Sequence, residues 1–302
     1  MELLSTIAEV KQMNYVVDHM KIVPESESRL SFNDRSYHFG DGVYEVVRIY
    51  DQTPFQLDEH WDRLFQSAKK LDMNVSFTAE ELTTLTYDLI KANQVIDGAL
   101  YIQVSRGATP RNHLYSREET PVVTGFTMNA PASKQEEGIS AWVTDDMRWL
   151  RCDIKTVNLL GNVMAKREAA DADCQEAILH REGTVTEGSS SNLFLVNNGT
   201  LYTHPATNLI LNGITRQLVI QLAKHAGYSV MEEPFPKDVL DHAEEAFITS
   251  TTSEVTPITE FKGQITATIP VGPVTRHLQT LFKEAIRKEQ NLARKEASET
   301  AE

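Results

Sequence analysis

Apolar positions recur with two different periods in the first part of the chain. Residues 43–50, VYEVVRIY, are rich in β-branched and aromatic side chains, and a polar turn follows at residues 51–53. Residues 58–72 place apolar side chains at i, i+3, i+4 and i+7, which is the spacing of an amphipathic helix. The pattern therefore predicts a strand followed by a helix.

Further elements are expected on either side of a polar segment at residues 129–138, NAPASKQEEG, which we interpret as a linker. Before it, Thr78 and Glu81 form the capping-box pattern that opens a helix. The other expected elements are strands at 100–106 and 121–128, hairpins at 176–188 and 192–204, and helices at 161–172 and 215–226. Strands and helices mix without regular β–α–β alternation, which favours the α+β fold class.

The 302 residues are enough for two domains, each with its own core. We expect a small N-terminal α/β domain over residues 1–130 and a larger C-terminal domain over residues 131–285. Residues 286–302 are charged, and we expect either a frayed helix or a disordered tail there.

Charge and composition narrow the possible partners. Lysine and arginine total 29 and aspartate and glutamate total 43, so the formal net charge is −14. This balance argues against nucleic acid and anionic membranes as partners. No apolar run approaches the ~18 residues of a membrane span. The two cysteines, Cys152 and Cys174, have no metal-ligand spacing and make no disulfide framework, so we expect no metal and a cytoplasmic location.

Lys155 is the first candidate for chemistry. It lies in RWLRCDIKTVN among apolar neighbours, and burial there would favour the neutral amine because desolvation disfavours the ammonium. A neutral amine attacks a carbonyl carbon and forms a Schiff base. The alternative is a lysine whose stem covers apolar surface while its ammonium reaches water.

Several polar segments are candidates for anion binding. Glu187 begins EGSSS, which is either an anion-binding turn whose acid faces a cation or an ordinary polar turn. Thr215 lies at the expected start of a helix, where it would serve as an N-cap or donate to a phosphate. Ser250 and Thr251 leave the same two possibilities open, since Thr251 and Glu254 form a capping-box pattern.

Arg111 and His113 lie two residues apart in the loop segment PRNH. Residues two apart in an extended loop point the same way, so the pair suits a substrate carboxylate that arginine grips through two hydrogen bonds. A solvated polar loop is the alternative. Tyr44 lies on the same strand face as Val46, so packing within the sheet is as plausible for it as a binding role. Arg63 lies off the apolar stripe of its helix, so its position alone predicts a solvated side chain.

Taken in order, seven segments of the chain resemble those of the fold-type IV pyridoxal-phosphate enzymes: GDGVYE, EHWDRL, PRNH, RWLRCDIKTVN, TVTEGSSSN, NGITR and TSTTSE. Within this fold type, the chain is most similar to the D-amino-acid (D-alanine) aminotransferases. The resemblance runs over residues 14–282, and PRNH and TVTEGSSSN are its specific segments. It implies a homodimer of two-domain chains, with pyridoxal 5'-phosphate as cofactor and the larger domain as its main binding domain.

The resemblance also implies roles for the candidate residues. Lys155 matches the lysine that holds the cofactor, and Glu187 matches the acid paired to its pyridine nitrogen. Tyr44, Arg111 and His113 match a substrate-carboxylate trap, the last two reaching in from the partner subunit. The remaining matches to the cofactor-binding set are Arg63, Ser189, Ser190, Leu211, Ile214, Thr215, Ser250 and Thr251. The chain departs from the pattern at Asn162, where we expect a small apolar residue.

The implied reaction is transamination between a D-amino acid, such as D-alanine, and a 2-oxo acid, such as 2-oxoglutarate, giving pyruvate and D-glutamate. A branched-chain L-amino-acid aminotransferase and an aminodeoxychorismate lyase of the same fold type are the alternatives. The pair Arg111 and His113 favours the D-specific enzymes over both. A non-catalytic protein on this scaffold is expected to lack Lys155 or Glu187, and both are present.

Overall fold

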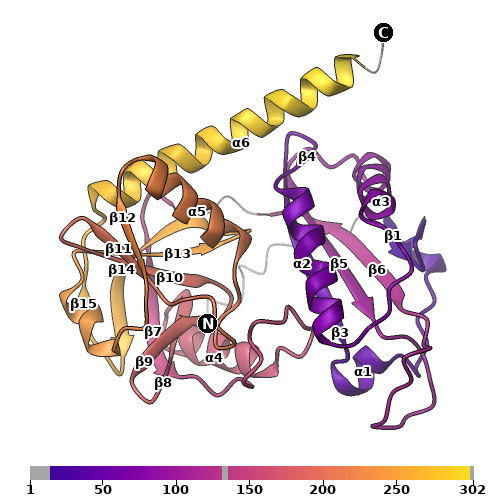
Figure 1. Cartoon of the computed structure of the whole chain (residues 1–302), viewed down its shortest axis with the longest axis horizontal. Coiled ribbons are helices and arrows are strands. Elements are labelled where there is room, and N and C mark those ends of the chain that lie inside the picture. The colour runs from indigo at the N-terminus through magenta and orange to yellow at the C-terminus, as the bar shows by residue number, and fades with distance from the viewer. Residues whose placement is uncertain (1–13, 131–134, 300–302) are drawn as a thin grey trace. The chain divides into compact units, whose positions relative to one another are not determined.

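The computed structural model describes residues 14–130 and 135–299. The chain divides into two compact units (Figure 1). Unit 1 consists of residues 1–131 and 155–158, and unit 2 of residues 132–154 and 159–302. The predicted linker at residues 129–138 falls where the chain first passes from one unit to the other, and its residues 131–134 lie outside the described part.

Unit 1 is an antiparallel sheet with helices packed on it. Its strands are β1 (Tyr15–Asp18), β2 (Lys21–Pro24), β3 (Gly42–Tyr50), β4 (Thr53–Pro54), β5 (Gly98–Ser105) and β6 (Val122–Met128). Its helices are α1 (Arg35–Phe39), α2 (Leu57–Lys70) and α3 (Ala79–Ala92), with a 3-10 turn η1 at Glu25–Glu27. The strand order is β2-β1-β6-β5-β3-β4. Helix α2 packs on β3, as Figure 1 shows. It also contacts α3.

The strand and the helix that the two hydrophobic periods predict pack against each other in unit 1. Strand β3 and helix α2 form where the pattern predicts them, and Trp61, Leu64 and Ala68 are buried on the inner side of α2. Helix α3 begins at the predicted capping box, in which the Thr78 hydroxyl accepts from Glu81 N and the Glu81 carboxylate accepts from Thr78 N. Both elements are therefore set by local sequence.

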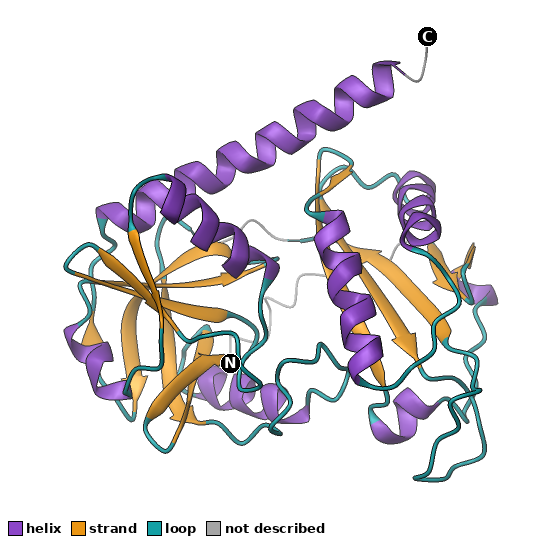
Figure 2. Ribbon diagram, in the orientation of Figure 1, coloured by secondary structure: helices purple, strands orange, loops and turns teal. Residues whose placement is uncertain are grey.

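Unit 2 is a mixed sheet with helices around it (Figure 2). Its strands are β7 (Ile139–Asp145), β8 (Glu176–Arg181), β9 (Thr184–Gly188), β10 (Asn192–Asn197), β11 (Thr200–Thr203), β12 (Ser229–Glu232), β13 (Glu245–Ser250), β14 (Glu254–Gly263) and β15 (Ala267–Thr268). The order is β12-β11-β10-β13-β14-β7-β8-β9, with β15 beside β14. Strand β7 runs parallel to both β8 and β14, and most other pairs are antiparallel. Fully buried Ile178, Leu195 and Phe261 belong to its core.

The helices of unit 2 are α4 (Leu160–Asp171), α5 (Ile214–His225), η2 (Lys237–His242) and α6 (Pro273–Glu299). Both hairpins turn where predicted, at Glu182-Gly183 and Asn198-Gly199, and all four residues have positive φ. The helix alternative for the tail is confirmed, because α6 continues to Glu299. Between residues 14 and 130 and between 135 and 299, we find no helix that combines the length and apolar character of a membrane span.

Two predicted caps are wrong. Thr215 is the second residue of α5 rather than its N-cap, because the extended residue is Gly213, whose φ is −62° and ψ 139°. Thr251 and Glu254 do not open a helix, because Glu254 is the first residue of β14 and pairs with Ser250 across a tight turn. At Thr251 the pairing of β13 with β14 overrides the local capping pattern, and at Thr215 the helix begins one residue earlier, at Ile214.

Candidate active site

Lys155 lies in a four-residue segment that pairs with the start of β3 in unit 1. Tyr44 N donates to Lys155 O at 3.0 Å, and Val157 N donates to Gly42 O at 3.0 Å. Lys155 N also donates to the Ser67 hydroxyl on α2 at 3.3 Å. These bonds fix the main chain on both sides of the lysine, so its side chain starts from a rigid base.

The Lys155 side chain lies over the ring of Tyr44. Its Nζ is 4.2 Å from the ring centroid, and the lysine is only partly buried. Tyr44 in turn stacks on Tyr101 with ring centroids 5.5 Å apart. The structure thus brings together two of the residues proposed for chemistry, the amine and the tyrosine of the carboxylate trap.

Behind Tyr44, the opposite face of β3 carries a buried acid. Glu45 is completely buried, and its carboxylate accepts from Arg63 Nε at 2.7 Å and Arg63 Nη2 at 2.8 Å. The oxygen that accepts from Arg63 Nη2, Glu45 Oε2, also lies 2.7 Å from His60 Nδ1. Burial alone would raise the pKa of Glu45, but Arg63 and His60 outweigh it and hold this pKa at about 2.

Glu45 therefore fixes both of its partners on α2. Burial lowers the pKa of His60, so the ring is neutral at neutral pH and its hydrogen bond to Glu45 requires the proton on Nδ1. The expectation of a solvated Arg63 is wrong, because its side chain is only 12% exposed and is held by both carboxylate oxygens. The family resemblance implies that Arg63 helps to bind the cofactor phosphate, and this stays a prediction.

Arg111 and His113 lie in the loop that joins β5 to β6, and both are exposed. The Arg111 guanidinium carbon is 5.0 Å from the centroid of the Phe39 ring, and the His113 ring is 5.4 Å from it. The two side chains therefore share one surface, in agreement with the expectation that they point the same way.

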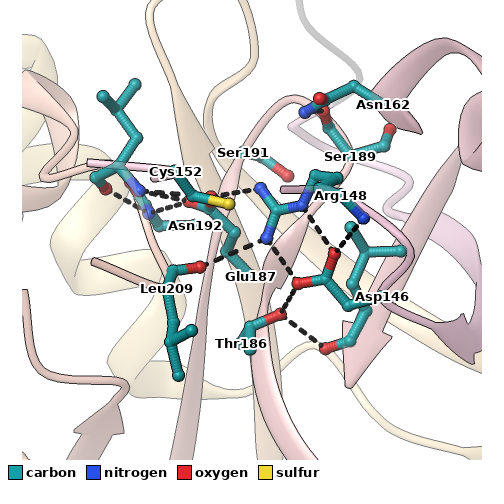
Figure 3. A network of polar contacts seen from close by, with 12 residues as sticks. Asp146, Arg148, Cys152, Asn162, Thr186, Glu187, Ser189, Ser191, Asn192 and Leu209 are labelled. Atoms are coloured by element: carbon teal, nitrogen blue, oxygen red, sulfur yellow. Dashed lines mark hydrogen bonds and ion pairs between the residues drawn. The ribbon is translucent and has the colours of Figure 1, made fainter. Parts of the chain in front are cut away.

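In unit 2, Glu187 is the centre of a hydrogen-bond network (Figure 3). One oxygen accepts from Arg148 Nη1 at 2.5 Å and the other from Asn192 Nδ2 at 2.9 Å. Leu211 N donates to both oxygens at 3.1 Å. Arg148 is held from behind by Asp146, through Nε at 2.9 Å and Nη2 at 2.8 Å.

Burial gives Glu187 an unusual pKa, and the hydrogen bonds of this network oppose the shift. Burial raises the pKa of Glu187 to about 7, although the Arg148 guanidinium opposes this shift. Burial alone would lower the pKa of Arg148, but its hydrogen bonds to Asp146 and the charge of Glu187 raise it above its ordinary value. Glu187 is therefore a buried carboxyl group whose pKa is raised and whose oxygens are held by Arg148, Asn192 and Leu211.

The three serines after Gly188 point to a second buried acid. Glu176 on β8 is 2% exposed and accepts from the hydroxyls of Ser189, Ser190 and Ser191, the last two at 3.0 Å. On the other side of the turn, Asn162 Nδ2 donates to Ser189 O at 2.8 Å. The departure at Asn162 thus adds a hydrogen bond to this turn. The cofactor contacts expected of Ser189 and Ser190 stay a prediction.

The remaining candidates of unit 2 lie at the start of α5 and in the turn after β13. No side chain caps α5 at Gly213, so the positive end of the helix dipole is left to another group. Ile214 and Thr215 are its first two residues, and both are buried. Gly213 lets the chain approach Asn192 closely, since an added Cβ would lie 2.2 Å from Asn192 Oδ1. Ser250 is the last residue of β13, and Thr251 is the first residue of the turn that joins β13 to β14.

Pyridoxal 5'-phosphate fits the residues present. A carboxyl group with its pKa near 7 suits the pyridine nitrogen, and an uncapped helix start suits the phosphate. The hydroxyl of Thr249, on the strand paired with Asn192, is buried and lacks a hydrogen-bond partner within the described chain. Within residues 14–130 and 135–299, no three histidines, cysteines or acids are grouped so that they would hold a metal ion.

Sequence reasoning missed four residues that hold the candidate site residues: Glu45, Asp146, Arg148 and Glu176. Glu45 had a detectable signal, because strict alternation places it on the same strand face as Val43 and Val47. An acid on an apolar face needs a buried cation. The partners of Glu187 had no such signal, since Arg148 lies in a loop and reaches it only through the tertiary fold.

A family model described as amino-transferase class IV matches residues 42–261. The chain belongs to the class IV aminotransferases. It is 48% identical over 268 residues to a protein of Bacillus licheniformis named D-alanine aminotransferase, covering 88% of this chain and 95% of that protein.

Solved structures of similar fold include aminotransferases that are named for branched-chain amino acids. The branched-chain aminotransferase of Escherichia coli superposes with a TM-score of 0.83 at 28% identity, covering 89% of this chain and 93% of that one. The branched-chain enzyme of Thermobaculum terrenum in its pyridoxal-phosphate form has a TM-score of 0.80 at 28% identity, with 92% and 95% coverage. These matches confirm the predicted α+β class and fold-type IV architecture.

The Glu45 cluster leads to a pH-dependent prediction. Because folding lowers the pKa of Glu45 from 4.5 to about 2, its stabilisation is fully present above pH 4.5 and is lost as the pH falls towards 2. Glu45→Gln should therefore reduce the free energy of unfolding by about 3–5 kcal/mol at pH 7, and by less at pH 3. Urea unfolding at both pH values measures this, with the exposed Glu59→Gln on α2 as the control. An equal loss at both pH values would contradict the assignment.

Proposed function

We propose that this aminotransferase transfers the amino group of a D-amino acid, such as D-alanine, to a 2-oxo acid, such as 2-oxoglutarate, forming pyruvate and D-glutamate. The observation that carries the proposal is the near full-length match, at 48% identity, to a protein named D-alanine aminotransferase. The branched-chain enzymes of known structure match at 28–31%. The PRNH segment, with Arg111 and His113 on one surface, supports the same choice over the branched-chain alternative.

The cofactor of the proposed reaction is pyridoxal 5'-phosphate attached to Lys155. When bound, it supplies an electron sink for the electrons left at the substrate α-carbon. In unit 2, Glu187 would hold the ring nitrogen, and Leu211, whose N–H is bonded to Glu187, would lie at the ring. The residues that would hold the phosphate are Arg63, Ile214, Thr215, Ser250 and Thr251, with Ser189 and Ser190 nearby.

The chain's own residues carry the proton transfers. Nζ of Lys155, once released by the substrate, takes the α-proton as a general base and later returns a proton. The fixed main chain around Lys155 keeps that nitrogen on one side of the site. Handedness then depends on where the carboxylate is held, which we assign to Tyr44 together with Arg111 and His113, the last two reaching in from the partner subunit.

Glu187 keeps a proton at the ring nitrogen. A carboxyl group whose pKa is about 7 can share a proton with a nitrogen of similar basicity. Arg148 is fixed by Asp146 and holds Glu187 in place. We assign the chemistry to Glu187 and the positioning to Arg148.

The active form that we propose is a homodimer. Helix α4 exposes Leu160, Val163 and Met164 at i, i+3 and i+4, with 68%, 58% and 64% of their surface accessible. An exposed apolar stripe of this kind is typical of a subunit interface.

Three further proposals concern the substrates, the domains and the location. We propose that all substrates are small molecules and that residues 131–285 form the cofactor-binding domain. We also propose a cytoplasmic location, which suits the free thiols Cys152 and Cys174.

Borohydride should fix the cofactor to Lys155. Reduction of the loaded protein followed by peptide mapping is expected to place the label there, because this lysine lies against Tyr44 on a fixed segment. Lys155→Ala should lose the label, and Lys166→Ala, which removes a half-exposed lysine of α4, should keep it. A label on another lysine in the unmodified chain would refute the assignment.

Glu187→Gln should keep the cofactor but slow the reaction. Glutamine preserves the hydrogen bonds from Leu211 and Asn192 yet cannot exchange a proton, so we expect the half-reaction to slow by roughly 10²-fold or more. Stopped-flow absorbance measures the rate. Glu182→Gln, in the exposed turn of the same hairpin, is the control. An unchanged rate in Glu187→Gln would remove the proposed role.

Activity on matched enantiomers tests the substrate. D-alanine and D-glutamate should be far better donors than their L-enantiomers, and Arg111→Ala should lower kcat/KM for them by roughly 10²-fold because a charged hydrogen-bond partner is lost. The cofactor spectrum should not change. Arg117→Ala, at an exposed site of the same loop, is the control. Equal or better turnover of L-leucine or L-valine by the unmodified enzyme would favour the branched-chain alternative.

A further inference from the structure

The loop that carries Arg111 and His113 is attached to the segment around α1. Thr109 N donates to Asn33 O at 3.0 Å, and Arg35 N donates to Gly107 O at 3.0 Å. Arg106 N donates to Asp41 O at 3.1 Å. The entry of the loop is therefore held by main-chain bonds on both sides of α1, before any side chain contributes.

Arg35 extends this attachment to the residues next to His113. It is 3% exposed, and its Nε donates to Asp41 Oδ2 at 2.8 Å. The rest of the guanidinium donates to Asn112 O at 2.6 Å and to His113 O at 3.4 Å. A buried cation, fixed by Asp41, which also accepts from Arg106 Nε, thus holds the carbonyls of Asn112 and His113.

Phe39 orders the side chains themselves. The guanidinium carbons of Arg35 and Arg111 lie 4.6 and 5.0 Å from the centroid of its ring. The His113 ring lies 5.4 Å away at an interplanar angle of 54°. One aromatic surface therefore contacts both exposed residues of the loop and the buried arginine that holds the loop. We call Arg35, Phe39 and Asp41 the α1 cradle.

An arginine on an exposed loop has many rotamers, and a ligand that selects one of them must offset the lost entropy. Contacts made before the ligand arrives reduce this cost and raise affinity. We propose that Arg35 and Phe39 are positioning residues that set the affinity for the substrate carboxylate and the preference for one enantiomer. The inference rests on the proposed function, because it requires Arg111 and His113 to bind that carboxylate.

The test uses two variants that damage the α1 cradle in different ways. Arg35→Lys keeps the charge next to Asp41 but loses the fork that reaches both carbonyls. Phe39→Leu leaves the ion pair intact and removes only the ring, so it carries the test if Arg35→Lys does not fold. The matched control is Arg29→Lys, at an arginine that also donates to two main-chain carbonyls, those of Ser26 and Ser28.

The measurements are steady-state kinetics with D- and L-alanine and inhibition by propionate, a carboxylate without an amino group. Both variants should raise KM for D-alanine and Ki for propionate about tenfold, equivalent to ~1.4 kcal/mol. The kcat should change less than KM, the cofactor absorbance should stay the same, and the D-to-L ratio should fall. A purely structural role would instead lower thermal stability without changing the enantiomer ratio or Ki.

A double-mutant cycle tests whether Phe39 acts through Arg111. Once Arg111→Ala has removed the group being positioned, Phe39→Leu should cause little further loss. Full additivity, or unchanged KM and Ki in both single variants while Arg111→Ala is impaired, would overturn this inference and leave the proposed function intact. Absent D-alanine activity in the unmodified enzyme, or an unaffected Arg111→Ala, would overturn the proposed function itself.

Discussion

A charged group that leaves water must be paired, and this constraint organises the polar interior of both units. Glu45 joins β3 to α2 through Arg63 and His60. Glu187 joins β9 to the loop at Arg148, which is itself held by an acid. In each case a buried carboxylate fixes the orientation of a neighbouring base or cation, so the packing that stabilises the unit also arranges its reactive groups.

Local sequence predicted most elements because their causes are local. The period of α2, the capping box of α3 and the glycine-containing turns of two hairpins each act within a few residues. The caps considered at Thr215 and Thr251 failed. At Thr251 the pairing of β13 with β14 decided the conformation, whereas at the start of α5 the extended residue is Gly213, two positions before Thr215. The order of the sequence motifs then identified the family, which the hydrophobic periodicity alone does not indicate.

Sequence patterns did not identify the residues that hold the candidate site residues in place. Lys155 and Glu187 stand within recognisable motifs, and Arg148 opens the same segment as Lys155. The contacts of Arg148, Glu176 and Arg35, however, are made with other parts of the chain. Arg35 is an example, because nothing in its own segment shows that its guanidinium reaches the carbonyls of residues 112 and 113. Such roles follow from tertiary geometry and leave no local pattern.

The pairing of Lys155 with the start of β3 also constrains the order of assembly during synthesis. Gly42 and Tyr44 emerge from the ribosome long before the segment that bonds to them. An N-terminal intermediate can complete the six strands of its sheet, yet the main-chain groups at the start of β3 must wait for residues from beyond β7. The segment of Lys155 is therefore synthesised only after the whole sheet of unit 1, and contacts this distant in sequence form slowly.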